Sequence, residues 1–326
     1  MPLESSFMSF LLRHQQKHGR TLNFLILMES ILTAAKQIRE AYINGAMQQN
    51  LGEAGGKNVQ GEDVMALDIQ AHNIVVHNLK GSDQVIQAVS EEQKEIIDLN
   101  PDGRYFVYFD PLDGSSNIKH SLPVGFMFGI TKRSLSGDED NHLRAGKEFI
   151  ASGMFLLPSG DLTFALRDAG CWRFLLDQTN TYVRPTRLKF PENKKTWEMS
   201  WNAGNRSTFS KKIQDWISKN EDTYNFRYTG ALAVDFHRLL HNGGIFFYPA
   251  ILNHPDAKKN RPKGKLRLLY ECNVVAMLAK EAGGIAIDEN GQDITEVKPE
   301  SHHQRSSIYI GNEEMIEGIR SSLTSS

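Results

Sequence analysis

Apolar residues at helical spacing mark the first long element of the chain. Over residues 22–43 they recur at i, i+3, i+4 and i+7 positions: Phe24, Leu27, Met28, Ile31, Ala35, Ile38 and Tyr42. This pattern predicts an amphipathic helix that ends at Asn44-Gly45, which is a C-cap signal. After a polar, glycine-bearing stretch at 52–61, a second helical pattern predicts a helix from Val64 to Gly81.

From Val85 onward the pattern changes to short β-branched and aromatic runs, which are typical of strands buried on both faces. We expect strands over six segments: residues 85–89, 105–109, 126–131, 150–157, 162–165 and 171–176. Residues 158–161 (PSGD) predict a hairpin turn between two of these strands.

Apolar periodicity fades around residues 185–195, where Lys, Pro and Asn dominate, and this predicts a domain boundary. Beyond it we expect helices at 210–218, 231–240 and 266–282, and strands at 245–248 and 285–287. Because helices and strands occur in both halves, the chain is predicted to form two α/β domains, residues 1–190 and 191–326.

Composition narrows the class of protein. The 326 residues carry 37 Lys and Arg against 39 Asp and Glu, a net charge of −2, which argues against a generic nucleic-acid or membrane-surface binder. The longest apolar runs are far shorter than the roughly 20 residues of a membrane helix. We therefore expect neither nucleic-acid nor membrane partners. Two cysteines are too few for a disulfide framework and fit a reducing compartment, so we expect a cytoplasmic protein.

The most informative segment is residues 110–117 (DPLDGSSN), directly after the predicted strand 105–109. Pro111 fixes φ and lacks an N–H group, so we expect it to end the strand. Asp110 and Asp113 can then face one point at the carboxyl end of the strand, where α/β sheets bind ligands. Carboxylate oxygens are the ligands that Mg²⁺ prefers.

The rest of this segment, Gly114-Ser115-Ser116, has no bulky side chains. Its backbone N–H groups and hydroxyls can therefore cradle an anion. Metal ligands beside an anion cradle are what a metal-dependent phosphatase needs. The alternative is an exposed turn, because Asp, Pro, Gly and Ser are common turn formers.

Ser90-Glu91-Glu92 follows the predicted strand 85–89 in the same way. Its alternative interpretation is a helix start, with Ser90 as N-cap and Gln93 as its capping-box partner. However, Asp110 ends a second strand, and carboxylates at two adjacent strand ends would repel one another strongly unless a cation lay between them.

A third cluster is basic. Between Asn253 and Arg267 one acid, Asp256, accompanies six cationic residues: Lys258, Lys259, Arg261, Lys263, Lys265 and Arg267. In a chain of balanced charge this indicates a phosphate-binding site. The alternatives are a solvated basic loop at 258–261 and a plain i, i+4 ion pair between Arg267 and Glu271.

Together these residues resemble the fructose-1,6-bisphosphatase class I family, within the Mg²⁺-dependent, lithium-sensitive sugar and inositol phosphatases. The matching segments are 110–117 at every position, Ser90–Glu92, 264–273 (GKLRLLYECN), Arg227-Tyr228, 243–249 (GGIFFYP) and His303–Arg305. The resemblance covers roughly residues 22–319. It implies a two-domain, layered α/β/α/β/α sandwich and a homotetramer.

The resemblance also implies roles for particular residues. Two or three Mg²⁺ ions, replaceable by Mn²⁺ or Zn²⁺, would be held by Glu91, Asp110, Asp113, Glu271 and the Leu112 carbonyl. The implied catalytic residues are Glu92, which would deprotonate the attacking water, Asp113, and Asp68, which would assist from a mobile loop at about 52–68.

Phosphate contacts are implied in the same way. The 1-phosphate would be held by Gly114, Ser115 and Ser116, with Arg267 nearby. The 6-phosphate would be held by Asn202, Tyr228, Tyr248, Lys265 and, from a neighbouring subunit, Arg227.

The implied activity is hydrolysis of the 1-phosphate of fructose 1,6-bisphosphate, a step of gluconeogenesis. The alternatives are a sedoheptulose-1,7-bisphosphatase or dual enzyme, and a sugar-phosphate-binding protein that has lost catalysis. The sedoheptulose-1,7-bisphosphatase or dual enzyme is favoured by Asn205, where the family usually has Tyr, and by extra residues near 256–261. Lys119 stands at an often acidic position and Val274 at a usual proline.

An AMP site is implied near residues 19–21, with Arg104, Tyr105 and Lys132 as contacts. Relative to the family pattern, Lys and Arg are exchanged at Arg104 and Lys132, so we expect weak or absent AMP inhibition. Cys272 and the His302-His303 pair are expected to be structural.

Overall fold

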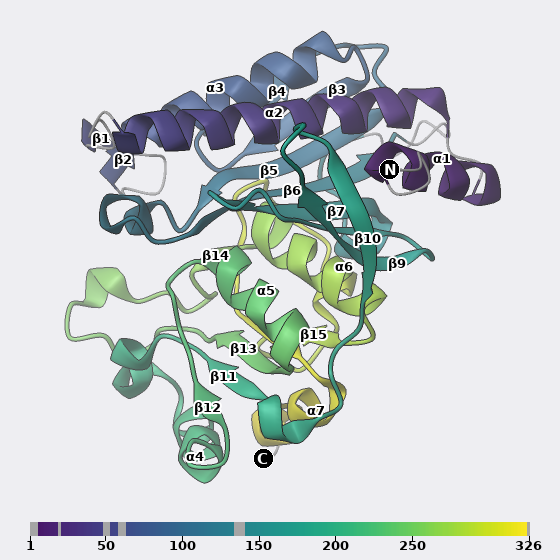
Figure 1. The fold of residues 1–326 in the computed structure, drawn as a ribbon. Helices are drawn as coiled ribbons and strands as arrows, with labels where there is room; N and C mark the ends of the chain where they lie inside the picture. The colour runs from purple at the N-terminus through teal and green to yellow at the C-terminus, as the bar shows by residue number, and fades with distance from the viewer. Residues whose placement is uncertain (1–5, 19–20, 48–52, 58–62, 134–140, 325–326) are drawn as a thin grey trace.

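Five layers make up the computed structural model, which describes residues 6–18, 21–47, 53–57, 63–133 and 141–324. Helices α2 and α3 cover one face of a large sheet, α5 and α6 lie between it and a smaller sheet, and α4 and α7 cover the far side (Figure 1). This arrangement confirms the predicted α/β/α/β/α sandwich. The α-helices are α1 (Phe7–His18), α2 (Leu22–Met47), α3 (Ala66–Gly81), α4 (Lys211–Asn220), α5 (Leu232–Asn242), α6 (Asn273–Glu281) and α7 (Glu313–Thr324).

The large sheet has eight strands in the order β10-β9-β8-β7-β6-β5-β3-β4. Only β3 and β5 run parallel, and the other neighbours are antiparallel. The strands are β3 (Val85–Ser90), β4 (Ile97–Asp98), β5 (Tyr105–Asp113), β6 (Val124–Lys132), β7 (Phe149–Leu157), β8 (Leu162–Leu166), β9 (Gly170–Leu176) and β10 (Tyr182–Leu188). Its outer face and the apolar sides of α1 to α3 enclose one hydrophobic core.

The smaller sheet has five strands in the order β12-β11-β13-β17-β15. They are β11 (Glu198–Ser200), β12 (Asn225–Phe226), β13 (Gly244–Tyr248), β15 (Ile285–Ile287) and β17 (Ile308–Gly311). Two short ribbons pair β1 (Glu53–Lys57) with β2 (Asp63–Met65) and β14 (Leu266–Arg267) with β16 (Arg305–Ser306). A second core fills the space between the sheets, and a third lies beneath the smaller sheet.

Several helix boundaries differ from the prediction. Helix α2 continues through Asn44-Gly45 to Met47, because a glycine costs a helix only about 1 kcal/mol and need not end it. Helix α3 begins at Ala66 because Val64 belongs to β2. The single helix expected at 266–282 is wrong: β14 comes first, then a π-helical turn over Leu268–Cys272, then α6.

Two prolines lie inside strands of the large sheet, one of them at a position where we expected a strand to end. Strand β5 passes through Pro111 to Asp113. Asp110 pairs with Met127 and Asp113 with Gly125, so three steps along β5 oppose two along β6. The extra residue forms a β-bulge, where Pro111, which has no N–H group, breaks no regular ladder hydrogen bond. Pro185 lies inside β10, an edge strand of the large sheet, so that sheet ends only at Leu188.

Among the described helices, none combines the length and the apolar character that crossing a membrane requires. Cys171 and Cys272 are both buried and unpaired, as expected for Cys272 from its place among apolar neighbours.

Candidate active site

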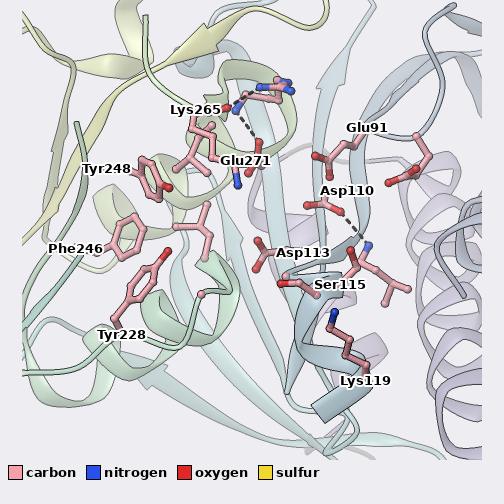
Figure 2. Close-up of a pocket in the computed structure, with 18 residues that line it drawn as sticks. Glu91, Asp110, Asp113, Ser115, Lys119, Tyr228, Phe246, Tyr248, Lys265 and Glu271 are labelled. Carbon is pink, nitrogen blue, oxygen red and sulfur yellow. Dashed lines mark hydrogen bonds between the residues drawn. The ribbon is translucent and has the colours of Figure 1, made fainter. Parts of the chain in front are cut away.

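A cavity of about 350 Å³ opens where β3 and β5 end, facing α5, β13 and the π-helical turn (Figure 2). It is lined by Glu91, Glu92, Asp110, Leu112, Asp113, Gly114, Ser115, Ser116, Lys119, Tyr228, Gly230, Leu232, Phe246, Tyr248, Lys265, Leu266, Arg267 and Glu271. The structure therefore brings together most of the residues singled out in the sequence, from both halves of the chain.

Three buried carboxylates form the centre of this cavity. Asp110, Asp113 and Glu271 are only 2%, 6% and 6% exposed, and one oxygen from each lies within 4.8 Å of the others. The bulge in β5 directs the two aspartates to the same side of the strand, and the π-helical turn supplies Glu271 (Figure 2).

Backbone N–H groups hold each carboxylate in place. Asp110 Oδ1 accepts a hydrogen bond from the Leu112 N–H at 2.9 Å, and Asp113 Oδ2 accepts one from the Ala233 N–H at 2.6 Å. Glu271 Oε2 accepts a bond from the Arg267 N–H at 2.6 Å. Glu271 thus contacts the backbone of Arg267. A plain i, i+4 ion pair between exposed side chains, which was the alternative interpretation, would have no such contact.

Crowding of buried negative charge shifts the pKa of all three groups. Burial, followed by repulsion from Glu91, raises the pKa of Asp110 well above its ordinary value. Burial raises the pKa of Asp113 to about 7, against the opposing effect of the Ala233 N–H group. Burial and then repulsion from Glu91 raise the pKa of Glu271 to about 8.

These shifts provide a test of whether the residues fit a metal ion. Buried carboxylates that are costly to ionise either bind protons or require a positive charge that compensates them. Arg267 lies near Glu271, but its guanidinium donates to the Lys265 carbonyl at 2.6 Å, and the pKa of Glu271 stays raised. An all-oxygen, strongly acidic donor set of this kind suits a hard divalent cation.

Glu91 and Glu92 follow the end of β3 and line the same cavity. The N-cap interpretation of Ser90 is wrong, because no helix begins there: the Ser90 hydroxyl contacts His72 Nδ1 at 2.8 Å and accepts from the Glu92 N–H at 3.3 Å. The Glu91 N–H donates to the Phe109 carbonyl at 3.1 Å, which ties this turn to β5.

The His302-His303 pair, from the C-terminal part of the chain, supports this turn. His303 contacts the Tyr270 hydroxyl through Nδ1 at 2.8 Å and the Gln93 carbonyl through Nε2 at 3.1 Å. His302 Nε2 lies 2.7 Å from the Lys94 carbonyl. Burial lowers the pKa of His303 to about 4, so the ring is neutral at pH 7. Both histidines therefore have the structural position that we expected.

The anion cradle begins at Gly114, which has φ 79° and precedes a 3₁₀ helix over Ser115–His120. A Cβ atom at Gly114 would lie 2.4 Å from the Cβ of Ala231, so both the conformation and the close approach require glycine. Lys119 lies on the same 3₁₀ helix and lines the cavity, and Figure 2 draws it at the edge of the cradle near Ser115. A phosphate in the cradle would therefore meet the small polar residues of 114–116 and, at the edge, the positive charge of Lys119.

Aromatic side chains form the opposite wall, where Tyr228, Phe246 and Tyr248 face the carboxylates (Figure 2). Lys265 also lines this part of the cavity, so a phosphate bound here would meet a cation and hydroxyl donors. Asn205 Nδ2 lies 3.4 Å from the Tyr248 hydroxyl, which places this departure from the family pattern beside the tyrosine wall.

Comparison with known proteins decides the family. The model for the N-terminal domain of fructose-1,6-bisphosphatase matches residues 5–183, and the model for its C-terminal domain matches residues 191–324. The fructose-1,6-bisphosphatase class 1 of Syntrophus aciditrophicus (strain SB) is 58% identical over 328 residues, covering 98% of this chain and 99% of that protein.

The chain belongs to the fructose-1,6-bisphosphatase class 1 family. Solved structures agree with this assignment. The holo form of Leishmania major fructose-1,6-bisphosphatase superposes with a TM-score of 0.87 at 28% identity, and its apo form with 0.83 at 27%; each comparison covers 98% of both chains. Use of a divalent cation is consistent with this family and with the buried acidic cluster.

Three of the residues that the family resemblance assigned to catalysis or to the 6-phosphate do not line the cavity. Asp68 is buried in the first turn of α3, and residues 52 and 58–62 of its predicted loop lie outside the described part of the chain. The Asn202 side chain caps a 3₁₀ helix by accepting from the Gly204 N–H at 3.1 Å. Arg227 is exposed and donates to the Phe226 carbonyl at 2.7 Å.

The predicted effector contacts gather at the other end of the large sheet. Tyr105 pairs with Lys132 across β5 and β6, and Arg104 precedes Tyr105. The Tyr105 hydroxyl lies 3.4 Å from Thr21 Oγ1. Residues 19 and 20 lie outside the described part, and AMP binding stays a prediction.

Some lining residues were not singled out from the sequence. Phe246 lies within the matching segment 243–249, which gave a signal that we did not assign to a side chain, and Gly230 and Leu232 gave none. The Ala233 N–H group that holds Asp113 is a backbone donor at the start of α5, and no residue type marks such a donor.

Proposed function

We propose that this chain hydrolyses the 1-phosphate of fructose 1,6-bisphosphate and releases fructose 6-phosphate and inorganic phosphate. The observation that carries the proposal is the cluster of Asp110, Asp113 and Glu271, which lies between the serine cradle and the tyrosine wall. One end of the cavity is suited to the phosphate that reacts, and the other end is suited to a second phosphate.

Mg²⁺ is the cation that we propose, in two or three copies held by Glu91, Asp110, Asp113, Glu271 and the Leu112 carbonyl. When bound, such ions lower the pKa of water and neutralise charge on the phosphoryl group and the leaving oxygen. Mn²⁺ or Zn²⁺ would fill the same ligand set. The raised pKa values of the buried acids support this assignment because a cation would favour their ionised forms.

The chain's own residues position the substrate and move a proton. The backbone and hydroxyls of Gly114, Ser115 and Ser116 bind the 1-phosphate, with Arg267 nearby. Glu92, which lines the cavity beside Glu91, accepts the proton of the attacking water. Phosphoryl transfer needs alignment and charge stabilisation more than a protein nucleophile, so this set is sufficient.

At the other end, Tyr228, Tyr248 and Lys265 bind the 6-phosphate. We propose that Asp68 assists the reaction when the loop before it closes, and that Asn202 contributes to binding the 6-phosphate. Arg227, which is exposed here, would reach the site of a neighbouring subunit in a homotetramer. The two unpaired cysteines support a cytoplasmic location, where thiols stay reduced.

A second candidate substrate is sedoheptulose 1,7-bisphosphate. The position of Asn205 beside the Tyr248 hydroxyl favours it, because a smaller side chain there leaves more room for a longer sugar.

Product analysis tests the proposal. We expect purified protein with Mg²⁺ to convert fructose 1,6-bisphosphate into fructose 6-phosphate and one equivalent of phosphate, identified by ³¹P NMR, with a higher kcat/KM than for sedoheptulose 1,7-bisphosphate. A higher kcat/KM for the seven-carbon sugar would favour the second candidate. Formation of fructose 1-phosphate would contradict the assigned orientation.

A further inference from the structure

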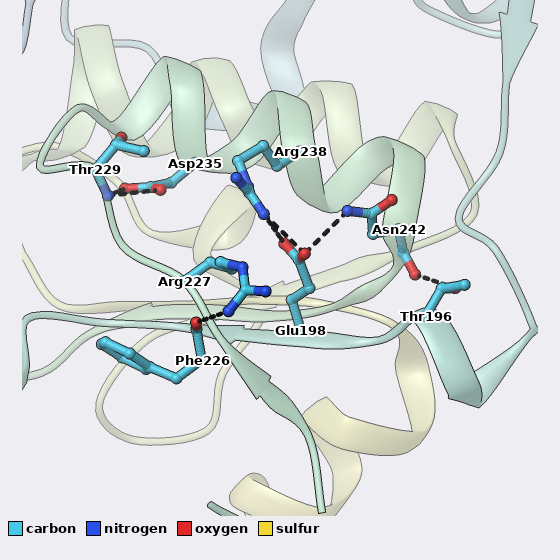
Figure 3. A network of polar contacts seen from close by, with 8 residues as sticks. All are labelled: Thr196, Glu198, Phe226, Arg227, Thr229, Asp235, Arg238 and Asn242. Carbon is cyan, nitrogen blue, oxygen red and sulfur yellow. Dashed lines mark hydrogen bonds and ion pairs between the residues drawn. The ribbon is translucent and has the colours of Figure 1, made fainter. Parts of the chain in front are cut away.

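The residue after Tyr228 is held through both of its backbone groups. The Thr229 N–H donates to Asp235 Oδ1 and Oδ2 at 3.0 and 3.1 Å (Figure 3). The Thr229 carbonyl accepts a hydrogen bond from Asn117 Nδ2 at 3.0 Å. Asn117 and Asp235 thus form a clamp that fixes the chain beside a tyrosine of the cavity wall.

Packing holds this segment only in part, because Tyr228 lies partly buried against the second core while the residues on either side of it are more open. Arg227 and Gly230 are exposed and Thr229 is half-buried, whereas Asn117 and Asp235 are only 7% and 2% exposed. A buried carboxylate that accepts a backbone N–H group makes a stronger bond than a neutral pair does. The Arg227 N–H also donates to the Met199 carbonyl at 3.0 Å, on the side of Tyr228 that faces β12. On the other side of Tyr228, Asn117 and Asp235 are the buried side chains that hold the backbone.

Each side of the clamp belongs to a different part of the site. Asn117 lies on the 3₁₀ helix that also carries Ser115 and Ser116 of the cradle. Asp235 lies on α5, whose first turn holds Asp113 through the Ala233 N–H group at 2.6 Å. Tyr228 is consequently linked to the cradle on one side and to the acidic cluster on the other.

Helix α5 is itself fixed to the smaller sheet. Arg238 donates to both carboxylate oxygens of Glu198 on β11, with the shortest contact at 2.8 Å, and Asn242 Nδ2 donates to Glu198 at 3.0 Å (Figure 3). Asp235 is thus carried by a helix that cannot shift without breaking a partly buried ion pair. The span between the serine cradle and Tyr228 is set by this framework.

We propose that Asn117 and Asp235 are positioning residues that set the spacing between the two phosphate sites and thereby select the length of the sugar bisphosphate. This inference rests on the proposed function. The carbon chain of a sugar bisphosphate fixes how far apart its phosphates lie, so a site of fixed span favours one chain length. If the clamp is loosened, Tyr228 moves, the second phosphate binds less well, and discrimination falls.

Kinetics on three substrates test this role in the variants Asn117→Ala and Asp235→Asn. Asn117→Ala removes the donor, and Asp235→Asn replaces one acceptor oxygen with an NH₂ group that opposes the Thr229 N–H. Losing a buried hydrogen bond costs roughly 1–3 kcal/mol, so we expect KM for fructose 1,6-bisphosphate to rise about tenfold. We expect kcat to change by less than about threefold, because the reacting end is retained.

Fructose 1-phosphate, which lacks the second phosphate, separates positioning from general damage. We expect its kcat/KM to stay within about threefold of wild type in both variants, while the preference for fructose 1,6-bisphosphate over sedoheptulose 1,7-bisphosphate falls. Matched controls are Asn100→Ala and Asp177→Asn, which remove the same kinds of contact in exposed turns and should change none of these values.

An equal loss on all three substrates, or an unchanged KM for fructose 1,6-bisphosphate in a folded variant, would overturn the inference. Circular dichroism and thermal unfolding report folding, and Asp235→Glu replaces Asp235→Asn if the latter does not fold. Absence of wild-type turnover would instead overturn the proposed function. In that case the Kd of each variant for fructose 1,6-bisphosphate, measured by calorimetry, tests the clamp, and a Kd equal to that of wild type would contradict its role in positioning Tyr228.

Discussion

Replacing Asp113 by asparagine should make the metal-free protein more stable and at the same time inactive. Asp113 is buried beside Asp110 and Glu271, so its charge opposes folding whenever no cation is bound. Asn has nearly the same shape, and its side-chain oxygen can still accept the Ala233 N–H bond. The substitution therefore removes the charge and keeps the contact that holds α5.

The magnitude follows from the pKa of Asp113, which burial raises to about 7 from its ordinary value of 3.8. Each pKa unit corresponds to about 1.36 kcal/mol, so about 3 units give a destabilisation of about 4 kcal/mol when Asp113 is ionised. This cost is absent below pH 4, grows between pH 4 and 7, and is complete above pH 7. Because Glu271 competes for protonation, we expect the variant to gain roughly 2–4 kcal/mol at pH 8.

Urea unfolding in excess EDTA at pH 5 and pH 8 measures this gain. We expect a clear increase in the unfolding free energy at pH 8 and a smaller one at pH 5, while added Mg²⁺ stabilises wild type and not the variant. Phosphate release from fructose 1,6-bisphosphate should fall by several orders of magnitude. A variant that is no more stable than wild type at pH 8 without metal would refute the electrostatic reasoning.

Three further perturbations test other parts of the site. Lys119→Glu should raise KM for fructose 1,6-bisphosphate several-fold, and 0.5 M KCl should reduce the difference, because Lys119 lines the cavity and its charge is screened by salt; an effect independent of salt would contradict this. Gly114→Ala should lower both the unfolding temperature and turnover, since its Cβ would lie 2.4 Å from that of Ala231 at φ 79°; wild-type values would show that the cradle adapts. His303→Phe should cost about 1–3 kcal/mol of unfolding free energy at pH 7. The pKa of His303 is lowered to about 4, so wild type loses stability as pH falls from about 6.5 to 4, and the variant should lose less; equal pH profiles would contradict the assignment.

Local chemistry explains why much of the site could be predicted from the sequence. Asp110 and Asp113 lie in a segment whose carboxylates, glycine and serines have one consistent use, and Glu91 follows the neighbouring strand. Six strands of the large sheet were predicted because each is a short apolar run between turn residues. The edge strands β4 and β10 were not predicted, since β4 has only two residues and β10 carries a proline and two arginines. The bulge at Pro111 was not predicted, because it depends on the register of β5 against β6, which no local pattern specifies.

Other features depend on contacts between distant parts of the chain. The π-helical turn that supplies Glu271 has the apolar pattern of an ordinary helix, so periodicity indicated one continuous helix there. The Ala233 N–H group and the clamp on Thr229 involve backbone atoms, which every residue carries. Asp68 and Arg227 were assigned by resemblance alone, and their predicted roles require a loop movement and a second subunit that local sequence does not describe.

Phosphate release from fructose 1,6-bisphosphate, measured with Mg²⁺ and again with excess EDTA, tests the central claim most directly. The claim is that buried carboxylates at the ends of β3 and β5 hold a divalent cation on which hydrolysis depends. We expect turnover with Mg²⁺, its loss in EDTA, its return when Mg²⁺ is added in excess, and no turnover of Asp110→Ala under any of these conditions. Turnover that persists in EDTA, or in folded Asp110→Ala, would contradict the account.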